Sequence, residues 1–154
     1  MSGGVTPVAE KKPTNLEIEG ISPLLQVYDM QTAVRFYTEV LGFELGTHSP
    51  IVKSPQGDYF HWAMLRLKNA TLMLNTAYDE GERPPQPDAR RVAAHEDTSL
   101  YFGCPDVDAV YNHVVRVGVT VRNKPANMGY GLRALTIQDP DGYNITFHGP
   151  LTPE

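Results

Sequence analysis

The chain has 154 residues, 41% of them hydrophobic, and a formal net charge of −5. This length and apolar fraction suffice for one domain with its own core. An acidic chain with scattered lysines and arginines disfavours nucleic acid as a partner and favours a cationic small molecule.

The N-terminus lacks the basic segment and apolar run of a signal peptide, and no stretch approaches the roughly 18 apolar residues of a membrane span. The single cysteine, Cys104, excludes an internal disulfide and gives no indication of an oxidising compartment. We therefore expect a cytoplasmic protein without membrane association. Residues 1–20 are predicted to form a flexible N-terminal tail.

Residues 21–76 have the pattern of a β-α-β-β-β unit. A strand is predicted over 23–28, and Asp29 after it is a good helix N-cap. Apolar residues then recur at helical spacing as far as Leu41, and Gly42 is suited to end the helix. A short strand follows, and two further strands over 60–67 and 70–76 form a hairpin.

Residues 98–150 repeat this pattern. A strand over 99–104 leads to a helix that Asp106 caps and Gly118 ends, and strands over 132–138 and 143–148 flank the turn 139–142. The repeat predicts an α+β fold of two tandem βαβββ modules forming a curved mixed sheet around a cleft. Together, residues 21–150 should make one structural domain.

The segment between the modules, residues 77–97, is rich in proline and charge. Its length of about 20 residues exceeds that of most loops in compact domains. Two interpretations are open: a mobile solvated linker, or a functional lid or arm.

Alternate residues of each predicted strand point to opposite sides of the sheet. One side is apolar and should lie under the helices; it comprises Leu25, Val27, Leu72, Leu74, Leu100, Phe102, Leu135, Ile137, Ile145 and Phe147. The other side mixes aromatic, thioether, amide and hydroxyl groups, as a ligand cleft does. Burial in a dimer interface without a ligand is the alternative. The parity of strand 60–67 is open, because the reverse register would expose His61 and bury Trp62.

The predicted ligand-binding residues come from this second side. They are Gln26, Tyr28, Trp62, Met64, Arg66, Met73, Asn75, Ser99, Tyr101, Tyr130, Thr146 and His148. Tyr130 lies between two glycines, where a loop could close over the cleft. Arg66 could instead recognise a carboxylate, and His148 could hydrogen-bond a ligand or act as a base. We predict no catalytic residue.

Three features of the chain indicate a known family: the paired units, the run from Asp29 to Gly42-Phe43, and Asp139-Pro140-Asp141-Gly142-Tyr143. With these features, the chain resembles the vicinal oxygen chelate superfamily over residues 22–149. This superfamily includes glyoxalase I, extradiol dioxygenases and bleomycin resistance proteins. Metal-dependent members hold their ion from the first and last strand of each half. The resemblance transfers those positions to Ser22, Met73, Ser99 and Thr146. Hydroxyl and thioether groups bind a hard divalent cation poorly, so we expect no metal and no cofactor.

The resemblance therefore implies the bleomycin resistance branch, whose members sequester a cationic drug in a cleft at a dimer interface. We expect a homodimer that binds a small aromatic or cationic molecule without a metal, with Trp62, Tyr101 and Tyr130 as stacking groups. Two alternatives stay open. One is a metal-dependent lyase or dioxygenase of the same superfamily, and the other is a dimer whose surface is itself the functional element.

Overall fold

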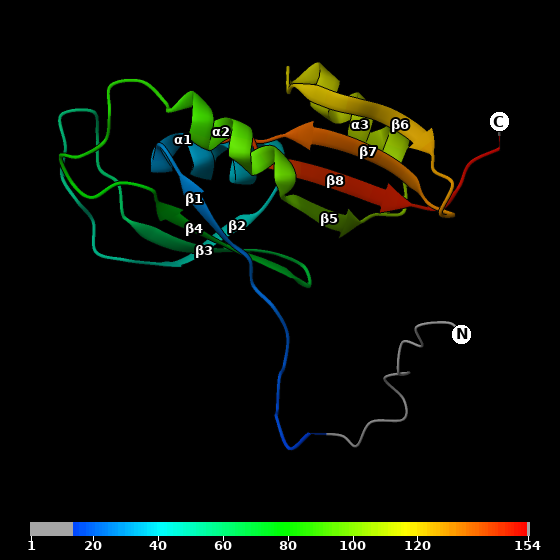
Figure 1. The fold of residues 1–154 in the computed structure, drawn as a ribbon, viewed down its shortest axis with the longest axis horizontal. Coiled ribbons are helices and arrows are strands. Elements are labelled where there is room, and N and C mark those ends of the chain that lie inside the picture. The colour runs from blue at the N-terminus through cyan, green and yellow to red at the C-terminus, as the bar shows by residue number, and fades with distance from the viewer. Residues whose placement is uncertain (1–13, 154) are drawn as a thin grey trace, which may run out of the picture.

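The computed structural model describes residues 14–153, which form two β-α-β-β-β modules (Figure 1). The first consists of β1 (Leu24–Val27), α1 (Met30–Arg35), the π-helical η2 (Phe36–Val40), β2 (Glu44–His48), β3 (Trp62–Leu67) and β4 (Ala70–Thr76). The second consists of β5 (Ser99–Gly103), α3 (Val107–Arg116), β6 (Val121–Asn127), β7 (Arg133–Gln138) and β8 (Asn144–Gly149). The predicted α+β class and the repeated module are confirmed.

Each module forms its own four-stranded mixed sheet. The strand orders are β1-β4-β3-β2 and β5-β8-β7-β6. β1 runs parallel to β4 and β5 parallel to β8, whereas the other neighbours are antiparallel. A parallel pair needs a crossover connection, and each crossover contains the helix that covers one side of the sheet.

The helix that begins after Asp29 changes its winding halfway. The Asp29 carboxylate accepts a hydrogen bond from the Thr32 N–H at 2.9 Å, as the sequence predicts for an N-cap. Beyond Arg35 the helix widens into η2, where the Leu41 N–H reaches the Phe36 carbonyl at 3.3 Å. This wider turn carries Tyr37, whose side chain is fully buried in the core.

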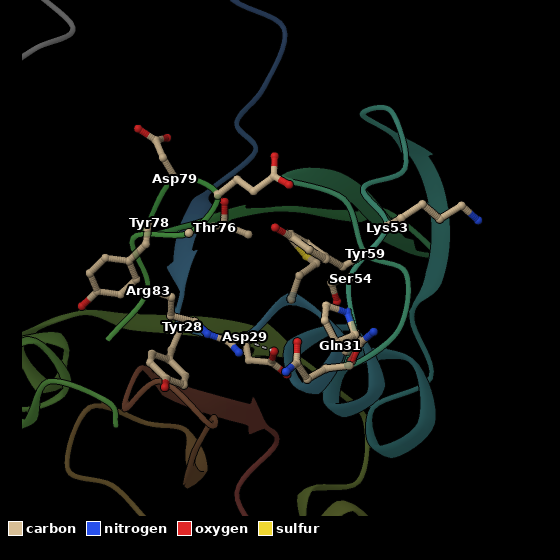
Figure 2. Close-up of a pocket in the computed structure, with 15 residues that line it drawn as sticks. Tyr28, Asp29, Gln31, Lys53, Ser54, Tyr59, Thr76, Tyr78, Asp79 and Arg83 are labelled. Carbon is tan, nitrogen blue, oxygen red and sulfur yellow. Dashed lines mark hydrogen bonds and ion pairs between the residues drawn. The ribbon is translucent and has the colours of Figure 1, made fainter. Parts of the chain in front are cut away.

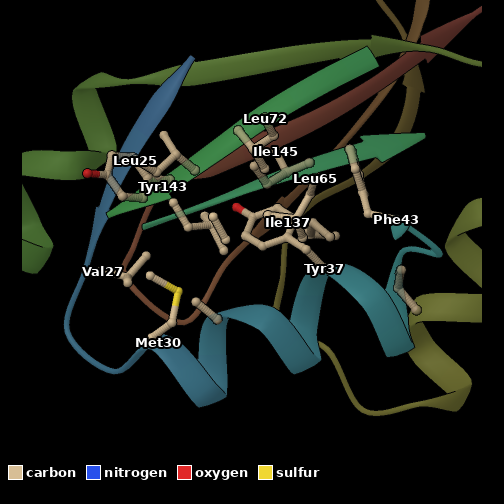
Figure 3. Packing of buried hydrophobic residues seen from close by; sticks show 14 of the residues in the cluster. Leu25, Val27, Met30, Tyr37, Phe43, Leu65, Leu72, Ile137, Tyr143 and Ile145 are labelled. Carbon is tan, nitrogen blue, oxygen red and sulfur yellow. The ribbon is translucent and has the colours of Figure 1, made fainter. Parts of the chain in front are cut away.

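One core serves both modules, because the helix-facing sides of the two sheets contribute to the same apolar cluster. Figure 3 shows Leu65 and Leu72 of the first sheet near Ile137 and Ile145 of the second, with Tyr37 among them. All ten residues predicted for the apolar side belong to this cluster or pack against it. On β3, Ala63 and Leu65 are both buried in the core. Trp62 alternates with them and therefore points to the side opposite the helices, as predicted.

The segment over residues 77–97 differs from the predicted linker, because it contains α2 (Ala89–Ala94) and the 3₁₀ turn η3 (His95–Asp97). Asp88 caps α2 by accepting a hydrogen bond from the Arg90 N–H at 3.0 Å. Arg91 then forms an ion pair with Asp141 at 3.1 Å and donates to the Gln26 carbonyl. A helix this short depends on tertiary contacts, which the composition of the segment does not reveal.

The turn between β7 and β8 joins the two modules. The Tyr28 N–H donates to Asp141 Oδ1 at 2.7 Å, and the Tyr37 hydroxyl donates to Asp139 Oδ2 at 2.6 Å. Asp139 also accepts the backbone N–H groups of Asp141 and Tyr143. Burial raises the pKa of Asp139 to about 6, although these hydrogen bonds oppose the rise. The sequence motif that predicts a tight turn therefore also ties the first module to the second.

Two further predictions concern the ends and the surface of the chain. The predicted tail falls mostly outside the described residues, and its described part, 14–20, is exposed and belongs to no helix or strand. No helix within residues 14–153 is long and apolar enough to cross a membrane.

Candidate functional site

The side of the first sheet opposite its helix carries two rows of candidate residues. We call this side, and its counterpart on the second sheet, the outward faces. Gln26, Asn75 and Trp62 lie side by side across β1, β4 and β3, and the Asn75 amide donates to Gln26 Oε1 at 3.3 Å. The adjacent row contains Met73 and Met64. The first outward face therefore offers an indole ring, two thioethers and two amides.

Arg66 stands apart from these rows. It lies at the hairpin end of β3, in register with Thr71 on one side and Glu44 on the other, and it is exposed. An exposed guanidinium between a hydroxyl and a carboxylate is well solvated and already has an acidic neighbour across the strand. This position does not single out Arg66 as a group that holds a ligand carboxylate.

The outward face of the second sheet carries exposed rings. Tyr101 of β5 is 54% exposed and Tyr130, in the loop between β6 and β7, is 56% exposed. A side-chain hydrogen bond with Tyr101 raises the pKa of Tyr130. The His148 ring lies 5.8 Å from the Tyr101 ring. The structure thus brings together three residues that are distant in sequence and that the sequence predicts for one site.

Other predicted residues of this face are less accessible. Thr146 is only 2% exposed, and its hydroxyl pairs with that of Thr136 at 2.7 Å. Ser99, in register with Asn144, is exposed. In this conformation Thr146 is covered by its neighbours, so a ligand on the outward face would contact the exposed rings and Ser99 rather than Thr146.

Within residues 14–153, the two outward faces do not enclose a common space. Because the helix-facing sides of both sheets share one core, each outward face points away from that core. Leu24, on the outward side of β1, is 43% exposed, and Tyr101 is similarly open. A cleft lined by both kinds of face would therefore require a second copy of the chain.

The residues at the family's metal positions do not fit a metal ion. Ser22 hydrogen-bonds the Thr71 hydroxyl, and Thr146 pairs with Thr136, so both hydroxyls are already engaged. Met73 contributes only a thioether, a ligand unsuited to hard divalent cations. Among residues 14–153, no group of three or more histidine, cysteine, aspartate or glutamate side chains is placed to hold a metal.

Tyr28 is not where the sequence places it. It follows the last residue of β1 and turns away from the outward face, and its hydroxyl donates to the Pro84 carbonyl at 2.7 Å. There it lines a pocket of about 340 Å³ (Figure 2). The Arg83 guanidinium lies 4.9 Å from the centre of the Tyr28 ring. Strand alternation predicts the side of a residue only within the strand, and Tyr28 lies beyond its end.

Sequence reasoning missed the other residues of this pocket. Gln31, Tyr59, Tyr78 and Arg83 come from the start of α1, the connection between β2 and β3, and the segment after β4. They share no spacing or motif, since only the folded chain brings these segments together. The proline-rich composition of segment 77–97 draws attention to Arg83 but does not indicate its partner.

The fold agrees with the comparisons to known proteins. Residues 20–147 match the model of the Glyoxalase/Bleomycin resistance protein/Dioxygenase superfamily, and the chain belongs to that superfamily. A Mycobacterium bovis protein of uncharacterised function, Mb0911c, is 28% identical over 134 residues, which cover 85% of this chain and 83% of the relative.

Two solved structures illustrate the fold. TnmS3, an antibiotic binding protein from Streptomyces sp. CB03234, superimposes with a TM-score of 0.61 at 26% identity, covering 89% of this chain and 100% of that one. A glyoxalase/bleomycin resistance protein/dioxygenase from Nocardioides gives a TM-score of 0.64 at 16% identity, covering 91% and 89%. The resemblance predicted from the sequence is confirmed at the level of superfamily and fold.

Proposed function

We propose that the protein binds a small aromatic or cationic molecule, without a metal, in clefts formed between the outward faces of two copies of the chain. The observation that carries the proposal is the group of Tyr101, Tyr130 and His148, in which both tyrosines, one on β5 and one in the loop between β6 and β7, remain more than half exposed. Exposed rings grouped on a rigid sheet offer stacking surface at low entropic cost.

The second copy supplies the wall that one chain lacks. The outward faces of one chain point away from their shared core, so a ligand on either face would stay open to water on one side. A ligand pocket normally encloses most of its ligand. Placing the first outward face of one copy, with Trp62, against the second outward face of another would enclose a cleft. Two copies would form two such clefts.

The chemistry of the faces favours a positively charged aromatic ligand. Rings attract a cation through their faces by about 0.5–2 kcal/mol per contact. The net charge of −5 adds a favourable long-range field at low salt. TnmS3, at 26% identity, is described as an antibiotic binding protein, which supports ligand binding rather than a purely structural role.

A fluorescence titration tests the proposal directly. Trp62 is the only tryptophan and lies on the first outward face, so bleomycin in the cleft should change its emission in a saturable way. Tyr101→Leu should weaken the apparent affinity about tenfold, because a stacking surface is lost. Tyr101→Phe keeps the ring and should stay within about twofold. Unchanged affinity in Tyr101→Leu, or no saturable change with bleomycin-like compounds, would refute the proposal.

A further inference from the structure

A second site lies at one end of the first sheet, apart from the outward faces. β1 and β4 are parallel, with Val27 opposite Thr76, so both strands release their chains at the same edge. The pocket of about 340 Å³ lies there, between the start of α1, the connection over residues 53–59, and residues 76–83. In open α/β sheets the carboxyl ends of the parallel strands commonly frame a ligand crevice.

Aromatic rings line this pocket. Tyr28, Tyr59 and Tyr78 come from three different segments, and the Tyr28 and Tyr78 rings meet edge to face at 6.3 Å. Figure 2 shows Tyr59 and Gln31 reaching into the pocket opposite Arg83 and Tyr28. A pocket of this size, with three phenol rings, fits a ligand of about one ring plus a short chain.

The pocket already holds one cation from its own chain. The Arg83 guanidinium lies over the Tyr28 ring and binds Asp29 Oδ1 at 2.6 Å, so a ring and a carboxylate jointly hold a positive group. The hydrogen bonds that Asp29 accepts from Thr32 and Arg83 lower its pKa, even though burial opposes the shift. The contacts of Arg83 with Tyr28 and Asp29 thus show that this side of the pocket can bind a positively charged group.

The other charged side chains that line the pocket make it electrostatically negative. Lys53 pairs with Asp58 at 2.7 Å, is 83% exposed and extends away from the pocket in Figure 2. Asp79 and Glu80 also line the pocket, and neither side chain makes an ion pair or hydrogen bond within residues 14–153. The Asp79 carboxylate points outward at the rim in Figure 2. The uncommitted charges at the pocket are therefore two carboxylates.

We propose that this pocket binds a small organic ammonium ion that carries an aromatic ring. The ring of Tyr59, which reaches into the pocket in Figure 2, contacts the apolar part, and the carboxylates of Asp79 and Glu80 attract the ammonium group at the rim. The site is independent of the proposed cleft, because its walls come from one chain and none of them lies on an outward face.

Binding of 2-phenylethylamine, followed by amide NMR spectra of the full chain, tests the inference. The ammonium form should shift the Tyr59 and Tyr78 signals in a saturable way, whereas the neutral analogue 2-phenylethanol should bind at least about fivefold more weakly. The double variant Asp79→Asn/Glu80→Gln should lose about fivefold to tenfold in affinity. Glu82→Gln, which removes one negative charge from the same segment without lining the pocket, should bind as the wild type does.

Three results would overturn the inference: no saturation with 2-phenylethylamine, equal binding of 2-phenylethanol, or shifts centred on Trp62 and Tyr101. The last result would place the amine in the proposed cleft. Failure of bleomycin to change the Trp62 emission leaves this test unaffected, so the two proposals stand or fall separately.

Discussion

Asp139 shows how one buried carboxylate sets a pH dependence. It is 6% exposed and accepts three hydrogen bonds, yet burial raises its pKa from 3.8 to about 6. The carboxyl group of Asp139 therefore binds its proton more tightly in the folded protein than in the unfolded chain. The resulting stabilisation is present below about pH 4 and is lost as the pH rises through about 6.

We expect Asp139→Asn to abolish this contribution. The free energy of unfolding of the wild type minus that of the variant should fall by about 2–3 kcal/mol between pH 4 and pH 7, as the shift of the pKa requires. Urea unfolding at four pH values measures this difference. Asp97→Asn, at an exposed carboxylate, is the matched control. A difference that is constant or rises over this range would contradict the account.

For single residues, the sequence predicts which side of the sheet a side chain faces wherever strand alternation determines it. Leu72 and Leu74 fall on the core side as expected, because period-two alternation holds inside a strand. It does not predict that Thr146 is buried by its neighbours on the outward side, or that Tyr28 turns into a pocket. Both outcomes depend on neighbouring segments that local patterns do not encode.

At the scale of elements, Arg91 is one of the side chains that hold α2 to the body of the protein. The Arg91 side chain is 15% exposed and that of its partner Asp141 is 3% exposed, so the ion pair is largely buried. The same guanidinium donates to the Gln26 carbonyl on the free edge of β1. One side chain therefore joins the helix, the first sheet and the turn of the second module.

Arg91→Met should destabilise the fold by about 2–4 kcal/mol, because it leaves the buried Asp141 carboxylate without its cation. Burial already raises the pKa of Asp141, and loss of Arg91 should raise it further. Arg90→Met, at an exposed site on the same helix, should change stability by less than about 0.5 kcal/mol. Urea unfolding compares them, and equal effects of the two variants would rule out the anchoring role of Arg91.

The sequence predicts the repeated elements well, because each is marked by its own cap, spacing and turn. Asp29 and Asp106 cap α1 and α3 as expected, since capping is a local interaction. The π-helical winding of η2 and the existence of α2 were not predictable in this way. Both are selected by contacts distant in sequence, namely Tyr37 with Asp139 and Arg91 with Asp141.

At the scale of the whole molecule, the shared core decides where a site can form. The sequence predicts the two modules and their polar sides but leaves open whether the cleft lies within one chain or between two. The core that joins Leu65 and Ile137 turns both outward faces toward solvent and favours the second arrangement. The pocket beside Tyr28 was not predictable, because three separate segments build it.

Native mass spectrometry with bleomycin tests the central claim of a shared cleft. We expect twice the chain mass of 17.1 kDa with two bound ligands. Leu24→Lys, a charge on the first outward face, should give free chains without ligand, because an unpaired charge in an interface is costly. Leu151→Lys, at a comparably exposed position near the C-terminus, should stay dimeric and liganded. A wild type that binds bleomycin as a single chain, or a dimer that binds none, would contradict the account.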